Sequence, residues 1–316
     1  MNKGGLSRLL RIVVAVLLTA YVIWRADPAL VMREATGLDW RWAGAAVALV
    51  LIDRSLMAYR WMVLLCALTP GSRPPFAEVL RIFFVSTFVG SFLPGVAGDV
   101  YRAYSLSRLR VDGAQAAASV VMDRALGILS MVIVAIVALA FAQEMMSVPG
   151  VSATVGISAL GCVIGAAALY SSRAAAAAHT LTSWLPGKKV RHLTGGLIDA
   201  VRKYTHHHRE LTVVLLASVA VQGFRVLQAF CLGMALGIST PLWVYFVFIP
   251  LIVIVLQVPI TISGLGVSQW TFELLFTRVG VSSEAAVALS ILFIALAFIG
   301  NLPGAVLYAT GKGAAR

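Results

Sequence analysis

Long apolar runs constrain this sequence more than any other feature. The runs Leu211 to Leu236 and Ala285 to Tyr308 reach the roughly 20 residues that an α-helix needs to cross the hydrocarbon core of a bilayer. Only 12% of the 316 residues are charged, about half the usual fraction in soluble domains. The sequence therefore predicts an all-α polytopic membrane protein.

Apolar segments follow one another at about 9–24, 41–68, 79–93, 117–141, 151–170, 211–237, 242–262, 264–276 and 284–309. The first has a basic start and no small-residue cleavage site, so we expect a retained helix rather than a signal peptide. Two segments end in helix breakers, which are Pro94, Gly95 and Gly98 in one case and Gly264 and Gly266 in the other. Broken backbone at membrane depth needs protein or water to satisfy it. These clusters therefore predict the tips of two re-entrant hairpins.

Basic residues predict the orientation, because Lys and Arg concentrate in cytoplasmic loops. The net charge of +12 is interpreted in this way rather than as nucleic-acid binding. Seven Lys and Arg lie in the linker 171–210 and three in the first 11 residues, whereas 142–150 contains none. We expect both termini and the linker in the cytoplasm of a bacterial inner membrane, and 142–150 outside. Six spans and two hairpins fit this pattern.

This topology divides the chain into a first membrane repeat, 1–141, an outer loop, 142–150, and a second membrane repeat, 151–316, which includes the linker. Each repeat contains three spans and one hairpin, and the two repeats have opposite orientations. At an offset of 170 residues, Arg108 aligns with Arg278 and Asp99 with Gln269. Inverted repeats with interrupted helices are typical of secondary transporters, whose sites lie near the midplane.

Asp99 and Arg102 directly follow the first cluster of helix breakers. On a helix that begins near Gly98 they share one face, and charges are costly inside a membrane unless they face a cavity. An Arg beside the N–H groups of a helix start suits a phosphate oxygen. Both residues are therefore candidate substrate ligands. The alternative is a buried ion pair between them that fixes the hairpin.

Five further polar side chains are candidate substrate ligands, namely Arg54, Arg124, Arg225, Gln269 and Glu273. Arg54 and Arg225 lie mid-span, and either line one cavity or pair structurally. Arg124 begins a span, where interfacial anchoring is the alternative. Glu273 is a candidate proton carrier, because an acid removed from water takes up a proton readily. Its alternative is an interfacial acid near Arg278.

The run of histidines at 206–208 is the remaining candidate for metal binding. Adjacent histidines on a helix point in different directions, and no Cys or acid cluster supports them. We expect a solvated linker feature here, with neither a metal nor a cofactor.

Two motifs carry a resemblance to a known family. Leu93, Pro94, Gly98, Asp99 and Arg102 match L-P-x-x-x-G-[DE]-x-x-R in full, whereas G-G-x-G-x-x-E is matched in part, with Ser263 for the first Gly and Gln269 for the Glu. With Arg60-Trp61 and Asp123-Arg124, the chain resembles over roughly 10–310 the flippase-like transmembrane family. That family includes the membrane region of lysylphosphatidylglycerol synthase, the multiple peptide resistance factor. The resemblance implies a lipid substrate, and the change at Gln269 implies that any proton or ion carried by that Glu is lost or not needed.

Three functions are compatible with these sequence features. A flippase or transporter of an anionic, phosphate-bearing lipid explains the inverted plan, the broken helices and the buried charges, with the tips at 94–99 and 263–269 meeting near the midplane. This favours a transporter over an enzyme. A membrane-embedded transferase acting on a lipid carrier needs an acidic constellation outside, yet 142–150 holds only Glu144. A non-catalytic partner of a lipid-modifying enzyme is the third alternative, with that enzyme supplied in trans because no synthase domain follows residue 316.

Overall fold

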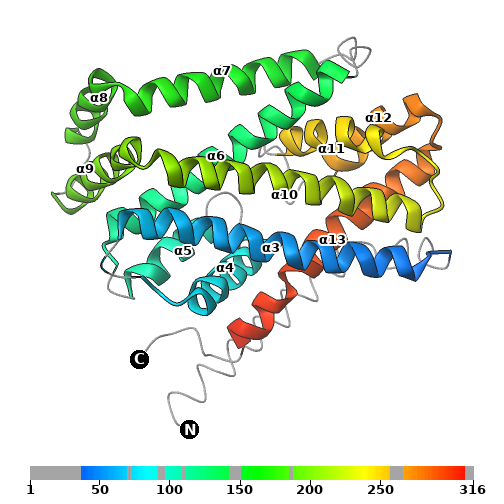
Figure 1. The fold of residues 1–316 in the computed structure, drawn as a ribbon, viewed down its shortest axis with the longest axis horizontal. Coiled ribbons are helices and arrows are strands. Elements are labelled where there is room, and N and C mark those ends of the chain that lie inside the picture. Colours follow the sequence, from blue (N-terminus) through cyan, green and yellow to red (C-terminus); the bar gives the residue numbers. More distant parts are fainter. Residues whose placement is uncertain are drawn as a thin grey trace, which may run out of the picture. The chain divides into compact units, whose positions relative to one another are not determined.

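In the computed structural model the described residues are 37–69, 71, 73–91, 97–108, 111–141, 151–184, 188–256 and 266–309. Every regular element in these ranges is a helix, which confirms the all-α class (Figure 1). The helices are α3 (Trp40–Leu68), α4 (Phe76–Gly90), α5 (Ala97–Ser107), α6 (Gly113–Phe141), α7 (Val151–Tyr170), α8 (Ser172–Ser183), α9 (Lys188–Lys203), η2 (Tyr204–His206), α10 (His208–Ala235), α11 (Leu242–Leu256), α12 (Val267–Phe276), η4 (Thr277–Val279) and α13 (Ser283–Ala309).

Three of the described helices, α6, α10 and α13, are long and apolar enough to cross a membrane. A fourth span is formed if α7 and α8, which meet at a bend of 88°, are counted together. These helices correspond to four of the six expected spans. The expected span 41–68 forms α3, which has the length but carries Asp53, Arg54 and Arg60 in its interior. The expected span 9–24 lies outside the described residues.

The helices belong to two compact units that interleave along the sequence. The first unit contains Met1–Ser55, Arg81–Gly98 and Val221–Arg316, and the second contains Leu56–Leu80 and Asp99–Ala220. The division into inverted halves, 1–141 and 151–316, stays a prediction.

Helices break at both places where the sequence predicts hairpins. The apolar helix α4 ends at Gly90 and α5 begins at Ala97, while α11 ends at Leu256 and α12 begins at Val267. The tip residues Pro94, Gly95 and Gly264 lie outside the described residues, and re-entry into the membrane stays a prediction.

Gly98 has a steric reason to be glycine. A Cβ added there would lie 2.7 Å from the carbonyl oxygen of Ser86 and 3.1 Å from the Cα of Gly90. Real Cβ atoms do not approach backbone oxygens so closely, so a side chain would force the backbone to shift. This glycine lets the start of α5 lie directly against the end of α4.

The core of the second unit forms around α6. Leu64 of α3, Met122 of α6 and Val214 of α10 pack with Ala200 of α9 in one buried cluster. Tyr204, which is fully buried, donates a hydrogen bond from its hydroxyl to the carbonyl oxygen of Leu64 at 2.8 Å. Burial raises the pKa of Tyr204, so this proton remains in place at physiological pH. The linker helix α9 is thus part of the core of this unit.

Aromatic rings fill the core of the first unit. Tyr245 of α11 packs edge-on against Phe276 of α12, with ring centroids 5.2 Å apart, and Phe272 stacks on Phe276 at 5.6 Å. Such pairs contribute about 0.5–1.5 kcal/mol each beyond the area that they bury. The pair of Tyr245 and Phe276 holds α11 to α12 across the second helix break, whereas Phe272 and Phe276 stack within α12.

Candidate functional site

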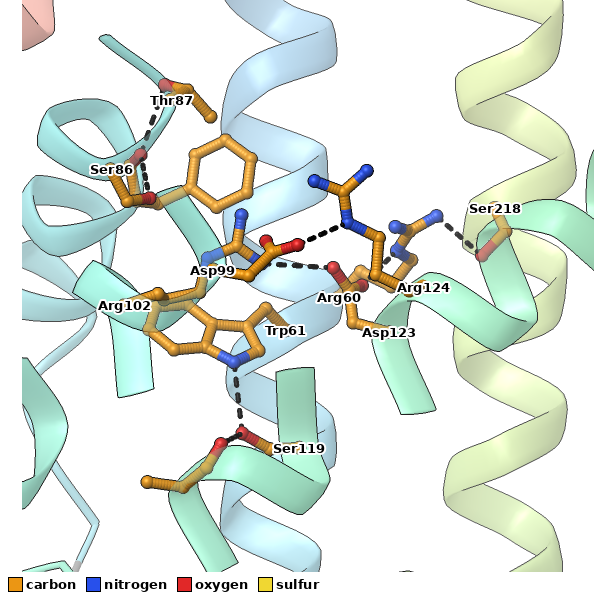
Figure 2. A network of polar contacts seen from close by, with 12 residues as sticks. Arg60, Trp61, Ser86, Thr87, Asp99, Arg102, Ser119, Asp123, Arg124 and Ser218 are labelled. Carbon is orange, nitrogen blue, oxygen red and sulfur yellow. Dashed lines mark hydrogen bonds and ion pairs between the residues drawn. The ribbon is translucent and has the colours of Figure 1, made fainter. Parts of the chain in front are cut away.

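Five charged side chains gather in the second unit and are called here the charged cluster: Arg60 of α3, Asp99 and Arg102 of α5, and Asp123 and Arg124 of α6 (Figure 2). Four of them are buried, and Arg124 is exposed. Buried charges persist only where other charges and hydrogen bonds compensate them.

Asp123 is the centre of the charged cluster. Its Oδ1 accepts a hydrogen bond from Nε of Arg60 at 2.8 Å, and its Oδ2 accepts one from Nη1 of Arg102 at 3.2 Å. All three side chains are 5% exposed or less. One carboxylate thus joins α3, α5 and α6 in a region of low dielectric, where its loss would remove the negative charge that two guanidinium groups share.

Neutral groups orient the two arginines that meet Asp123. Arg60 also donates from Nη1 to the hydroxyl of Ser218 on α10 at 2.8 Å. The guanidinium of Arg102 lies over the ring of Trp61, 4.8 Å from its centroid, within the range of a cation–π interaction. Trp61 in turn donates from Nε1 to the hydroxyl of Ser119 at 3.1 Å. These contacts fix both guanidinium groups in single orientations.

The edge of the charged cluster is formed by Arg124 and Asp99. Nε of Arg124 donates to Oδ2 of Asp99 at 2.8 Å, and the side chains are 56% and 11% exposed. Asp99 lies in the first turn of α5, where the helix dipole favours a negative charge. Figure 2 shows the two Nη atoms of Arg124 lying beyond the Nε that meets Asp99.

The charged cluster carries three guanidinium groups and two carboxylates, which leaves one excess positive charge. Guanidinium groups present paired N–H donors that match the oxygens of phosphate and carboxylate. An anion could therefore bind at the exposed edge, where Arg124 is accessible. In the described part of the chain no group of three or more His, Cys, Asp and Glu side chains could hold a metal ion.

The sequence-derived candidates divide between the two units. Asp99, Arg102 and Arg124 lie together in the charged cluster, whereas Arg54, Arg225, Gln269 and Glu273 belong to the first unit. Asp99 accepts a hydrogen bond from Arg124, and Arg102 donates one to Asp123, with Arg124 and Asp123 both on α6. The alternative of an ion pair between Asp99 and Arg102 stays a prediction.

Arg54 takes part in a second polar group, called here the amide network. Its Nε donates to Oδ1 of Asn301 on α13 at 3.1 Å, and its Nη1 meets Oδ2 of Asp53 at 3.2 Å. Nδ2 of Asn301 donates to the hydroxyl of Ser91 at 2.8 Å. The amide network therefore links α3, the end of α4 and α13 within the first unit.

The three other candidates in the first unit have local partners. Arg225 donates from Nη1 to Oε1 of Gln222, on the same helix, at 3.3 Å. Oε1 of Gln269 accepts from the backbone N–H of Gly266 at 2.6 Å and so caps the start of α12, while Gly266 has φ of +84°. Glu273 accepts a hydrogen bond from the hydroxyl of Ser283. Substrate contact by these residues stays a prediction.

Sequence reasoning did not place Arg60, Asp123, Ser218 or Asn301 among the candidate ligands. Charge balance offered a signal for the first two, since an Arg inside an apolar helix needs an acid from elsewhere in the chain. Asn301 could have been noticed as an amide inside an apolar span. Ser218 carried no such signal, because serine is common in membrane helices.

A comparison with known protein families identifies a relationship of this chain. The model of the family described as the lysylphosphatidylglycerol synthase TM region matches residues 8–304. No curated protein matches the chain.

Proposed function

The chain belongs to the family of the lysylphosphatidylglycerol synthase TM region, and on that premise we propose that it moves an anionic, phosphate-bearing lipid between the two leaflets of a bacterial inner membrane. The family name points to a phosphatidylglycerol head group as the first substrate to test. The charged cluster is the observation that carries this proposal.

Arg124 is the residue that we assign to the head group. A lipid phosphodiester offers the same kind of charged oxygen as Asp99, so it can replace Asp99 or bind beside it on the exposed guanidinium. The excess positive charge of the cluster offsets the charge of the phosphate. Asp123 meanwhile keeps Arg60 and Arg102 in place, at 2.8 and 3.2 Å. The arrangement thus combines a fixed interior with one arginine that can exchange partners.

Transport can be tested in proteoliposomes that contain phosphatidylglycerol labelled on its acyl chain. A quencher that cannot cross the bilayer removes the signal from the outer leaflet alone, unless the protein brings inner-leaflet lipid to the surface. We expect faster and more complete quenching with the protein than without it. An acyl-labelled phosphatidylcholine, whose head group has no net charge, should be moved more slowly.

The variant Arg124→Gln tests the assigned residue. Loss of a charge-assisted hydrogen bond costs about 1.5–3 kcal/mol, so we expect transport of phosphatidylglycerol to fall by roughly 10- to 100-fold. Arg278→Gln is the matched control, because Arg278 is also exposed and donates only to the backbone oxygen of Leu274 among the contacts described. Equal rates for both lipids would contradict head-group selection. Absence of transport in the wild type would favour the transferase or the non-catalytic partner.

A further inference from the structure

Helix α7 has the features of a span that faces lipid on several sides. It is 20 residues long, which corresponds to about 30 Å of helix and to the thickness of the hydrocarbon core. Ile157, Leu160, Val163 and Ile164 are between 59% and 72% exposed, and all six residues from 163 to 168, more than one full turn of the helix, are exposed. Apolar side chains exposed in this way need lipid tails as their surroundings.

Helix α8 turns away from α7 by 88° directly after Tyr170 (Figure 1). The hydroxyl of Ser171 accepts a hydrogen bond from the N–H of Ala174 at 3.2 Å, which caps α8 and fixes the turn. If α7 crosses the bilayer at the usual tilt of about 20°, α8 runs close to the membrane plane. Tyr170, 55% exposed at the turn, has the position of an aromatic residue at the head-group level.

The end of α8 exposes large apolar side chains. Leu181 is 74% exposed and Trp184 is 83% exposed, although a water-soluble turn would be expected to carry polar residues here. Tryptophan next to a helix in the membrane plane is typical of residues that insert among lipid head groups.

Helix α9 buries one side against α6. A Cβ added at Gly196 would lie 3.2 Å from the Cβ of Ala114, and Ala200 is 3% exposed. Its basic residues Arg191 and Lys203 are exposed, as is Arg173 of α8. The segment 171–210 has seven Lys and Arg against two acids, an excess of five positive charges. One of those acids, Asp199, meets Nε2 of His179 at 3.1 Å and ties α8 to α9.

We propose that residues 171–184 and 188–203, which contain α8 and α9 and are called here the α8–α9 hairpin, form a binding surface for an anionic membrane leaflet. Leu181 and Trp184 insert at the level of the head groups, while Arg173, Arg191 and Lys203 attract lipid phosphates. Excess positive charge selects an anionic surface over a neutral one. Because α9 packs on α6, the bound leaflet also supports the helix that carries Asp123 and Arg124. This surface does not depend on the transport activity proposed above.

Nitroxide labels on the full-length protein in lipid nanodiscs provide the test. The native Cys66, Cys162 and Cys231 are first replaced by Ser, and a cysteine for labelling is introduced by Trp184→Cys. Collision with oxygen, which enters lipid, is compared with collision with a water-soluble nickel chelate. We expect the label at position 184 to meet oxygen more often in bilayers that contain phosphatidylglycerol, and to become water-accessible in pure phosphatidylcholine. A label from Ile157→Cys should report hydrocarbon in both.

Removal of charge on the hairpin provides the matched comparison. The triple variant Arg173→Gln, Arg191→Gln, Lys203→Gln should shift the equilibrium at position 184 from inserted to released by roughly 100-fold. The triple variant Arg41→Gln, Arg108→Gln, Arg278→Gln removes equal charge at exposed positions outside the hairpin and should leave the depth unchanged. The proposal is overturned if the label is water-accessible in anionic bilayers, if insertion ignores lipid charge, or if neither probe reaches the label, which would indicate a protein partner.

Discussion

Arg54 and Arg60 lie on the same helix, α3, yet they have different partners. Arg60 meets the carboxylate of Asp123, 63 residues away, at 2.8 Å, and both side chains are 4% exposed. Arg54 meets the neutral amide of Asn301 at 3.1 Å and the acid of its own neighbour, Asp53, at 3.2 Å, with 13% exposure.

The two arginines differ in where the opposite charge that compensates them comes from. The Arg60 pair holds separate helices together by opposite charges, so loss of Asp123 removes from the core the negative charge that compensates Arg60. Arg54 carries part of its compensation on its own helix. Loss of Asn301 would therefore remove two hydrogen bonds but would leave the charge of Arg54 beside that of Asp53.

The largest effect should come from Asp123→Asn. The variant leaves Arg60 and Arg102 without their shared carboxylate, and breaking a buried ion pair costs about 3–5 kcal/mol. We expect a large fall in the apparent melting temperature of the purified protein in detergent. Asp199→Asn is the control, since the side chain of Asp199 is 65% exposed and its contact is worth little. Unchanged stability of Asp123→Asn would mean that the two guanidinium groups have sufficient compensation elsewhere.

Asn301→Ala should have the next largest effect. It removes the acceptor for Nε of Arg54 and the donor to Ser91, and each lost hydrogen bond costs about 0.5–1.5 kcal/mol. We expect a smaller fall in melting temperature than for Asp123→Asn under the same conditions. A larger fall would reverse the comparison and make the amide network the main support of its helices.

Trp61→Phe separates the two roles of the tryptophan. The ring remains over Arg102, but the hydrogen bond from Nε1 to Ser119 is lost, at a cost of about 1 kcal/mol. Trp61→Leu also removes the aromatic face and should destabilise the protein further, because the cation–π contact is lost. The melting temperatures of the two variants give the order. If they are equal, the ring face contributes nothing to holding Arg102.

Arg124→Gln should have the smallest effect on stability. Its side chain is 56% exposed, and exposed ion pairs contribute about 0–1 kcal/mol. We expect almost no change in melting temperature, together with the large loss of lipid transport proposed above. A melting temperature as low as that of Asp123→Asn would instead assign Arg124 a structural role and would remove the distinction between the edge and the interior of the charged cluster.

Local features of the sequence were enough to predict the helical class and the places where helices break. Apolar runs demand helices in a bilayer, and proline and glycine interrupt them within a few residues. Partner choice was not predictable in the same way. Asp99 pairs with Arg124, 25 residues away, and Arg54 with Asn301, 247 residues away. Which residues meet across such separations in the sequence depends on how whole helices pack. The contact of Gln269 is local by comparison, because its amide oxygen accepts from the N–H at the start of its own helix.

The cap on α12 has an energetic consequence. The amide of Gln269 neither gains nor loses a proton in the pH range of a cell. The cap at the start of α12 therefore does not depend on the pH on either side of the membrane. No proton is collected at this position from one compartment and delivered to the other. A proton carried by α12 would therefore have to sit on another side chain of this helix, of which Glu273 is the candidate named above.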